Sequence, residues 1–207
     1  MKRAGLSLLL LALAVPAACA APAQEDIAAT ANRVADWQLA NLESLDGIRT
    51  FHERTAQQRG WVRAAFYIGL ERWQGVTGDA TYLQALYAMA EANEWRLDDR
   101  FWHADDQAIA QVYLGLEDAD IGPTQRAFDE VLALNPRNSL EFTPPTEQDV
   151  EGGCQKRWCW CDALFMAPPA WAALTNVTGD PRYMDYAVRE YLATRDYLFD
   201  DELKLFY

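Results

Sequence analysis

A turn that occurs twice, 101 residues apart, constrains the fold of this chain more than any other feature of its sequence. The first copy, Val-Thr-Gly-Asp-Ala-Thr-Tyr, runs from Val76 to Tyr82, and the second, Val-Thr-Gly-Asp-Pro-Arg-Tyr, runs from Val177 to Tyr183. In both copies the glycine permits the left-handed conformation that ends a helix, and the aspartate can cap the next helix. Pro181 suits the first position of that next helix. The repeat therefore predicts helical hairpins in succession.

Apolar residues recur at helical spacing along most of the chain and show no convincing alternation with a period of two. The pattern predicts helices near residues 26–44, 61–75, 79–94, 104–117, 123–134, 162–175 and 180–197. At roughly fifty residues a hairpin, these helices make about three and a half hairpins. We therefore expect an all-α fold of consecutive antiparallel hairpins, with no sheet of three or more strands.

Two acidic motifs stand out against these helices. In the first, Asp162 follows Trp160 and leads an apolar run up to a double proline. Such a carboxyl is expected to be poorly solvated, which raises its pKa toward the range useful for proton donation. The alternative is that Asp162 is only the N-cap of the helix that follows. In the second motif, Asp105 and Asp106 open the helix predicted from 104, and one of them is expected to cap it.

The segment Trp160–Met166, read as W-x-D-[AG]-L-[FY]-M, resembles the active-site signature of the unsaturated rhamnogalacturonyl hydrolases. These are glycoside hydrolases related to the unsaturated glucuronyl hydrolases. The stretch His103–Leu114 is similar to the second acidic motif of that family and lies one helical hairpin earlier. The resemblance extends from about Ile27 to Tyr207 and implies an (α/α)6 barrel, in which six hairpins close a ring.

By that comparison the chain holds about half a barrel, an incomplete ring of about three to four hairpins. The sequence ends at Lys204–Tyr207 with neither a helix stop nor a polar tail, so we expect it to be the N-terminal part of a longer enzyme. The alternative is an open solenoid, which would need a polar capping helix. Family residues that hold the substrate carboxylate would lie beyond Tyr207, and we therefore expect this chain to be inactive by itself.

The resemblance implies hydration of an unsaturated uronic acid at the nonreducing end of an oligosaccharide, as in the degradation of pectin or other polysaccharides. The resulting hemiketal opens and releases the next sugar. It assigns Asp162 the role of general acid and base, and Trp160 that of packing against the sugar. One of Asp105 and Asp106 would orient the substrate or tune the main acid, and of the two we favour Asp106.

The formal net charge of −13 argues against nucleic acid and anionic membrane surfaces as partners. An anionic sugar therefore needs a local cationic site, for which the candidates near the motifs are Arg63, His103, Lys156 and Arg157. Arg63 or Tyr67 would contact sugar hydroxyls if they face a barrel lumen, although the apolar residues around them are better explained as core. A lone histidine before a helix, such as His103, is more often a surface or hydrogen-bonded residue than a ligand for the sugar.

We expect neither a cofactor nor a metal ion. With only two histidines in the chain, the spacing Cys154, Cys159, Cys161 is a poor zinc signal. These three cysteines are more readily loop or core residues, and one bridge from Cys154 to Cys159 or to Cys161 is compatible with an oxidising compartment.

Residues 1–20 are typical of a secretory signal peptide, with a basic start, the apolar stretch Leu6–Val15 and a cleavage site after Ala20. The stretch is too short to span a bilayer. We therefore predict a periplasmic or secreted domain over residues 21–207. Lipid attachment at Cys19 is the alternative, although Pro16 stands where that signal prefers leucine.

Between residues 135 and 153 lies a long segment with two adjacent prolines and no helical period. Long loops inside compact domains are usually functional or mobile. Because this one leads directly into the Asp162 motif, we expect it to form a wall or lid over the site.

Two other classes of function compete with a hydrolase. A non-catalytic helical-repeat module would use its aromatic residues to bind polysaccharide, with Asp162 pointing outward or acting only as a cap. Another (α/α)-barrel enzyme, such as a polysaccharide lyase or a sugar epimerase, is the third class. The epimerase would need paired histidines, and the chain has two in all.

Overall fold

The computed structural model describes residues 23–42, 57–142 and 153–206, and it confirms the predicted all-α fold. The predicted signal peptide and part of the predicted loop before the Asp162 motif lie outside these ranges. The helices are α1 (Gln24–Ala40), α2 (Trp61–Thr77), α3 (Ala80–Ala92), α4 (Ala104–Gln107), α5 (Ala110–Tyr113), α6 (Gly122–Leu134), the 3-10 helix η2 (Gly153–Lys156), α7 (Ala163–Met166), α8 (Pro168–Thr178) and α9 (Pro181–Leu198).

Two short strands, which the sequence did not predict, follow the last helix. Strand β1 (Phe199–Asp200) pairs antiparallel with β2 (Leu205–Phe206), so the described residues contain a sheet of two strands only.

Helix α1 belongs to a unit of its own, and the rest of the chain, from Asn41, forms the second compact unit. Glu25 and Asp26 lie in the first turn of α1, where a negative charge suits the partly positive end of the helix. The helix ends at Ala40, four residues before the predicted boundary at 44.

Both copies of the repeated turn adopt the predicted structure. Gly78 and Gly179 end α2 and α8 in the left-handed region, with φ of 67° and 74°. Asp79 and Asp180 then cap α3 and α9, each accepting a hydrogen bond from the backbone N–H two residues later, at 2.7 and 2.9 Å. The tyrosine that ends each copy is buried. The turns therefore join α2 to α3 and α8 to α9 as hairpins.

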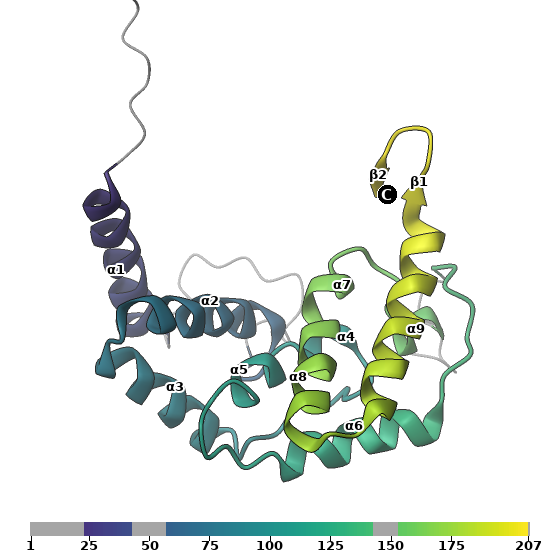
Figure 1. The fold of residues 1–207 in the computed structure, drawn as a ribbon, viewed down its shortest axis with the longest axis horizontal. Helices are drawn as coiled ribbons and strands as arrows, with labels where there is room; N and C mark the ends of the chain where they lie inside the picture. Colours follow the sequence, from purple (N-terminus) through teal and green to yellow (C-terminus); the bar gives the residue numbers. More distant parts are fainter. Residues whose placement is uncertain (1–22, 43–56, 143–152, 207) are drawn as a thin grey trace, which may run out of the picture. The chain divides into compact units, whose positions relative to one another are not determined.

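Within the second unit the helices form two layers (Figure 1). Helices α2, α5 and α8 lie side by side on the inner side, because α5 packs against both α2 and α8. Helices α3, α6 and α9 cover their outer side, and α6 packs against α9. Alternation of inner and outer helices along the chain is the arrangement found in the wall of an (α/α) barrel.

Two helices that were predicted as continuous are interrupted. The helix expected over 104–117 is present as α4 and α5, with a turn at Ala108 and Ile109 between them. The helix expected over 162–175 breaks at Ala167, because Pro168 and Pro169 have no N–H to donate to the preceding turn. The apolar period runs through both breaks, which is why periodicity alone missed them.

The side chain of Gln111 in α5 compensates for the missing donors. Its Nε2 donates to the backbone oxygens of Phe165 and Met166, both at 2.9 Å. A buried carbonyl without a partner costs about 1–3 kcal/mol, so this contact fixes the α7–α8 joint to α5.

Trp171 of α8 lies at the centre of the core and is fully buried. Its indole stacks between the rings of Phe128 and Tyr186, each with a centroid separation of 4.2 Å. The indole Nε1 donates to Gln107 Oε1 at 2.9 Å, and Gln107 in turn donates to the Phe101 carbonyl at 2.8 Å. This chain of contacts fixes α8 and α9 to the helix that carries the second acidic motif.

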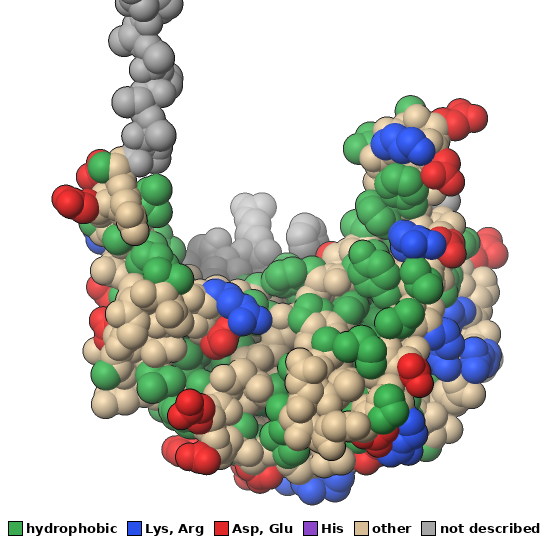
Figure 2. Space-filling view, viewed as in Figure 1, with side chains coloured by type: hydrophobic (Ala, Val, Ile, Leu, Met, Phe, Trp, Pro, Cys, Tyr) green, Lys and Arg blue, Asp and Glu red, His purple; other side chains and the backbone are tan. Residues whose placement is uncertain are grey.

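The surface of the molecule agrees with its acidic composition. Figure 2 shows Asp and Glu side chains spread across the visible face, whereas Lys and Arg lie mainly on the side of α6 and α9. No helix in the described ranges is long and apolar enough to cross a membrane.

Candidate active site

A narrow pocket opens where the start of α4 faces the segment that precedes α7. Helices α4 and α7 pack against each other, and this contact brings the two acidic motifs together. The pocket is lined by His103, Ala104, Asp105, Gln155, Arg157, Trp158, Cys159, Trp160, Asp162 and Ala163. Five of the residues singled out from the sequence therefore share one site: Asp162, Asp105, Trp160, His103 and Arg157.

Asp105 is the perturbed carboxyl of this pocket. Its side chain is 15% exposed. Burial, followed by the negative charge of Asp162, raises the pKa of Asp105 from its ordinary value of 3.8 to about 6, and the Arg100 guanidinium offsets part of the shift. A carboxyl with such a pKa holds a proton under mildly acidic conditions, as expected for a group used in acid–base chemistry.

Asp162 has neither the poor solvation nor the capping hydrogen bond that its sequence context suggested. It is exposed, so the poor solvation expected for this side chain is wrong and occurs at Asp105 instead. It occupies the N-cap position of α7, but its side chain makes no capping hydrogen bond there. The Asp162 carboxylate is therefore available to a ligand in the pocket.

Asp106, the second acid favoured from the sequence, lies outside the pocket lining and is only 2% exposed. Its carboxylate accepts hydrogen bonds from Arg100 through the backbone N–H at 2.9 Å, Nε at 3.3 Å and Nη2 at 2.5 Å. Burial raises the pKa of Asp106, and these bonds oppose the shift. Asp106 thus fixes the turn before α4, and Asp105 is the aspartate that faces Asp162.

His103, and neither aspartate, caps α4. Its Nδ1 accepts a hydrogen bond from the Asp105 N–H at 3.2 Å and lies 3.7 Å from the Asp105 carboxylate. A neutral imidazole that accepts at Nδ1 carries its proton on Nε2. His103 is therefore a capping residue that also lines the pocket.

Trp160 is 44% exposed at the edge of the pocket. Its ring lies near that of Phe142, with a centroid separation of 6.2 Å. An exposed indole beside polar groups suits stacking on a sugar ring. The described part of the long loop thus reaches the site at Phe142, whereas residues 143–152 of the expected wall or lid lie outside the described residues.

Arg63 and Tyr67 do not line this pocket. Both lie on α2 and are buried, at 8% and 4% exposure, and Arg63 Nη1 donates to Gln58 Oε1 at 2.6 Å. Of the four candidate cations, His103 and Arg157 line the pocket and Arg63 and Lys156 do not.

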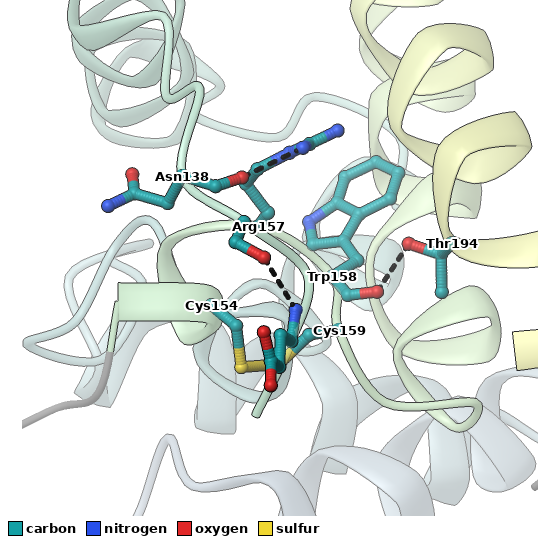
Figure 3. Close-up of a disulfide and its surroundings, with 8 residues drawn as sticks. Asn138, Cys154, Arg157, Trp158, Cys159 and Thr194 are labelled. Carbon is teal, nitrogen blue, oxygen red and sulfur yellow. Dashed lines mark hydrogen bonds between the residues drawn. A yellow bond between two sulfur atoms is a disulfide. The ribbon is translucent and has the colours of Figure 1, made fainter. Parts of the chain in front are cut away.

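The disulfide joins Cys154 to Cys159, one of the two pairings considered (Figure 3). Cys161 is free and exposed. The disulfide closes the turn directly before Trp160. Leu140 packs against both bridged cysteines.

Several residues that shape the site were not singled out from the sequence: Arg100, Gln107, Gln111 and Glu190. For Gln107, Gln111 and Glu190 the available signal was a polar residue at a helical position, whereas Arg100 lies in the turn before α4 and gave no such signal. Within the described ranges, no group of three or more His, Cys, Asp or Glu side chains could hold a metal ion.

The protein is an array of helical hairpins with two carboxyls in one pocket. Its fold is of the all-α class found in (α/α)-barrel glycosidases. A solved polysaccharide lyase shares this fold, with a TM-score of 0.56 over 86% of this chain and 50% of that chain, at 23% identity. The chain belongs to glycosyl hydrolase family 88, whose model matches residues 24–207.

Two curated relatives carry the name unsaturated 3S-rhamnoglycuronyl hydrolase. The protein from Alteromonas sp. (strain LOR) is 41% identical over 88% of this chain and 48% of its own length. The protein from Formosa agariphila is 35% identical over 70% of this chain and 39% of its own length. The chain therefore spans about half the length, or less, of the curated relatives it matches.

Proposed function

We propose that the protein acts on oligosaccharides with a 4,5-unsaturated uronic acid at the nonreducing end and hydrates its double bond. The observation that carries the proposal is the shared pocket of Asp105 and Asp162, beside the exposed Trp160. Membership in a family of glycoside hydrolases and the names of the relatives support it.

The reaction needs one carboxyl that first gives and then takes a proton. Asp162 protonates one carbon of the double bond, and water adds to the other carbon while Asp162 accepts a proton from it. The product is a hemiketal at the former double-bond carbon that is bonded to the ring oxygen. This hemiketal opens and releases the next sugar. Because Asp162 is exposed and lines the pocket, its carboxyl is open to a ligand there.

Asp105 is the second acid in this scheme. When it holds a proton it adds no negative charge beside an anionic substrate and can donate a hydrogen bond. Trp160 packs on the sugar face, while His103 and Arg157 supply the cationic or donor groups that a uronate requires. The names of the relatives favour rhamnoglycuronyl oligosaccharides over galacturonyl ones.

The proposed place of action is the periplasm or the outside of the cell. The disulfide between Cys154 and Cys159 supports an oxidising compartment.

Loss of ultraviolet absorbance tests the reaction directly, because hydration removes the conjugated double bond. The chain, and the full product of the reading frame that contains it, would each be incubated with lyase-generated unsaturated oligosaccharides and with saturated ones of the same composition. We expect the full product to consume the chromophore and to leave saturated chains intact, and the chain alone to be inactive. Cleavage of saturated chains with no loss of chromophore by the full product would contradict the proposal.

A further inference from the structure

The segment that carries the second carboxyl of the pocket has no regular secondary structure. Residues 157–162 lie between η2 and α7 as a series of turns. Five of these six residues nevertheless line the pocket, all but Cys161. Their position must therefore come from side-chain contacts with other elements.

One face of α9 makes three of those contacts. Tyr186, Glu190 and Thr194 recur every four residues, so they lie on one face of the helix, and all three are buried. The Tyr186 ring meets Trp158 edge-on with a centroid separation of 5.7 Å, and the Thr194 hydroxyl donates to the Trp158 carbonyl (Figure 3). Between them, Glu190 Oε2 accepts a hydrogen bond from Arg157 Nε at 2.7 Å.

Burial of a carboxylate at the centre of this face of α9 costs free energy. Glu190 is 0% exposed, and a buried charge is costly unless it is paired and hydrogen-bonded. Arg189, the adjacent residue of α9, already donates to Glu190 Oε1 at 2.8 Å. The second cation, Arg157, comes from the pocket segment, and its Nη1 also donates to the Asn138 carbonyl at 2.9 Å. Two of its nitrogens are therefore held in place.

We propose that Glu190 is a positioning residue for the active site: it fixes Arg157, and with it the Trp158–Asp162 backbone that places Asp162 opposite Asp105. Thr194 acts with it by holding the carbonyl of Trp158. The catalytic consequence rests on the proposed function, whereas the structural consequence does not.

Amide hydrogen exchange of the full-length product tests the structural part. Glu190→Leu removes the acceptor of Arg157. Arg189→Met is the matched control because it removes the other cation from the same carboxylate, and the further contacts of Arg189, with Asn135 and the ring of Tyr186, lie outside residues 157–162. We expect the peptide that covers residues 157–166 to exchange at least about tenfold faster in Glu190→Leu and at the wild-type rate in Arg189→Met. Equal exchange of this peptide in the two variants, or no change in either, would overturn the proposal.

Glu190→Gln keeps the size of the side chain and one acceptor oxygen. It replaces the leucine variant if that one does not fold, and it should show a smaller change in the same direction. Wild-type exchange in Glu190→Gln, with Glu190→Leu unfolded, would mean that the carboxylate serves stability alone and would also overturn the proposal.

Steady-state kinetics test the catalytic part. We expect kcat of the Glu190 variants to fall by about tenfold or more, since a misplaced acid weakens the chemical step. KM should rise as well, because Arg157 is a proposed ligand of the uronate. Arg189→Met should keep the wild-type kcat even if its Tm falls by as much as that of the Glu190 variants. If kcat falls in proportion to Tm in the Glu190 variants and in Arg189→Met, Glu190 has no positioning role. If the wild type itself leaves unsaturated oligosaccharides unchanged, the proposed function fails, and the hydrogen exchange still decides the role of Glu190.

Discussion

Two adjacent aspartates, Asp105 and Asp106, have opposite roles in this structure. Asp106 is bound by Arg100 and lies outside the pocket, whereas Asp105 faces Asp162 and has a raised pKa. Neighbouring residues on a helix point about 100° apart, so the orientation of the short helix α4 about its axis decides which one enters the pocket. The local sequence does not predict this orientation of α4, because the orientation depends on the hydrogen bond from Arg100 to Asp106 and on His103 as the N-cap.

Asp105 should cost the protein stability at neutral pH. Its folded-state pKa of about 6 lies above its ordinary value of 3.8, so its contribution is complete below pH 3.8 and is lost as the pH rises through about 6. Asp105→Asn avoids that loss and should raise the free energy of unfolding near pH 7.5 by up to about 3 kcal/mol, with little change near pH 4. Urea denaturation at the two pH values measures the difference. An equal effect of the substitution at both values would show that Asp105 is not perturbed as described.

At the scale of elements, local signals predicted the turns but not the breaks within helices. Both Thr-Gly-Asp turns formed as expected, because a left-handed glycine and a capping aspartate act within a few residues of each other. The interruption at Pro168 is tolerated because Gln111, a residue far away in the sequence, binds the carbonyls of the α7–α8 joint. The disulfide was left open between two partners for a similar reason, since spacing alone does not place Cys159 nearer than Cys161.

The glycine inside α2 and the glycine that ends it should respond in opposite ways to alanine. Gly78 has φ of 67°, which disfavours any Cβ, so Gly78→Ala should lower the free energy of unfolding by about 1–2 kcal/mol. Gly69 lies inside the helix, where a Cβ would meet no other atom within 4 Å, and Gly69→Ala should raise it by about 0.5–1 kcal/mol. Urea denaturation measures the free energy of unfolding of both variants, and the two changes should have opposite signs. If Gly78→Ala proved as stable as Gly69→Ala, the turn would not be the fixed end of α2.

At the scale of the whole molecule, the net charge of −13 on the chain opposes the approach of the anionic substrate that we propose for it. In the described part of the pocket, His103 and Arg157 are the lining residues that can carry positive charge, and they face two carboxyls. The long-range field of the protein should therefore slow the approach of a uronyl oligosaccharide.

Salt should accordingly increase kcat/KM. Raising the ionic strength from about 0.01 M to 0.15 M shortens the screening length from about 30 Å to 8 Å, which weakens repulsion at a distance but leaves contacts within the pocket nearly intact. We expect kcat/KM for unsaturated uronyl oligosaccharides to rise by a few-fold with kcat unchanged. A fall in kcat/KM over this range would indicate that a cationic surface guides the substrate and that the net charge is irrelevant.

The most direct test of the account is the rate at which Asp162→Asn consumes the chromophore of unsaturated uronyl oligosaccharides. Asparagine keeps the size and much of the hydrogen bonding of the side chain but cannot donate or accept the catalytic proton. Initial rates of absorbance loss at saturating substrate would be compared with those of the wild-type full-length product. The account predicts a fall in kcat by a factor on the order of 10² or more, with folding unchanged. Turnover near the wild-type rate in Asp162→Asn would contradict it.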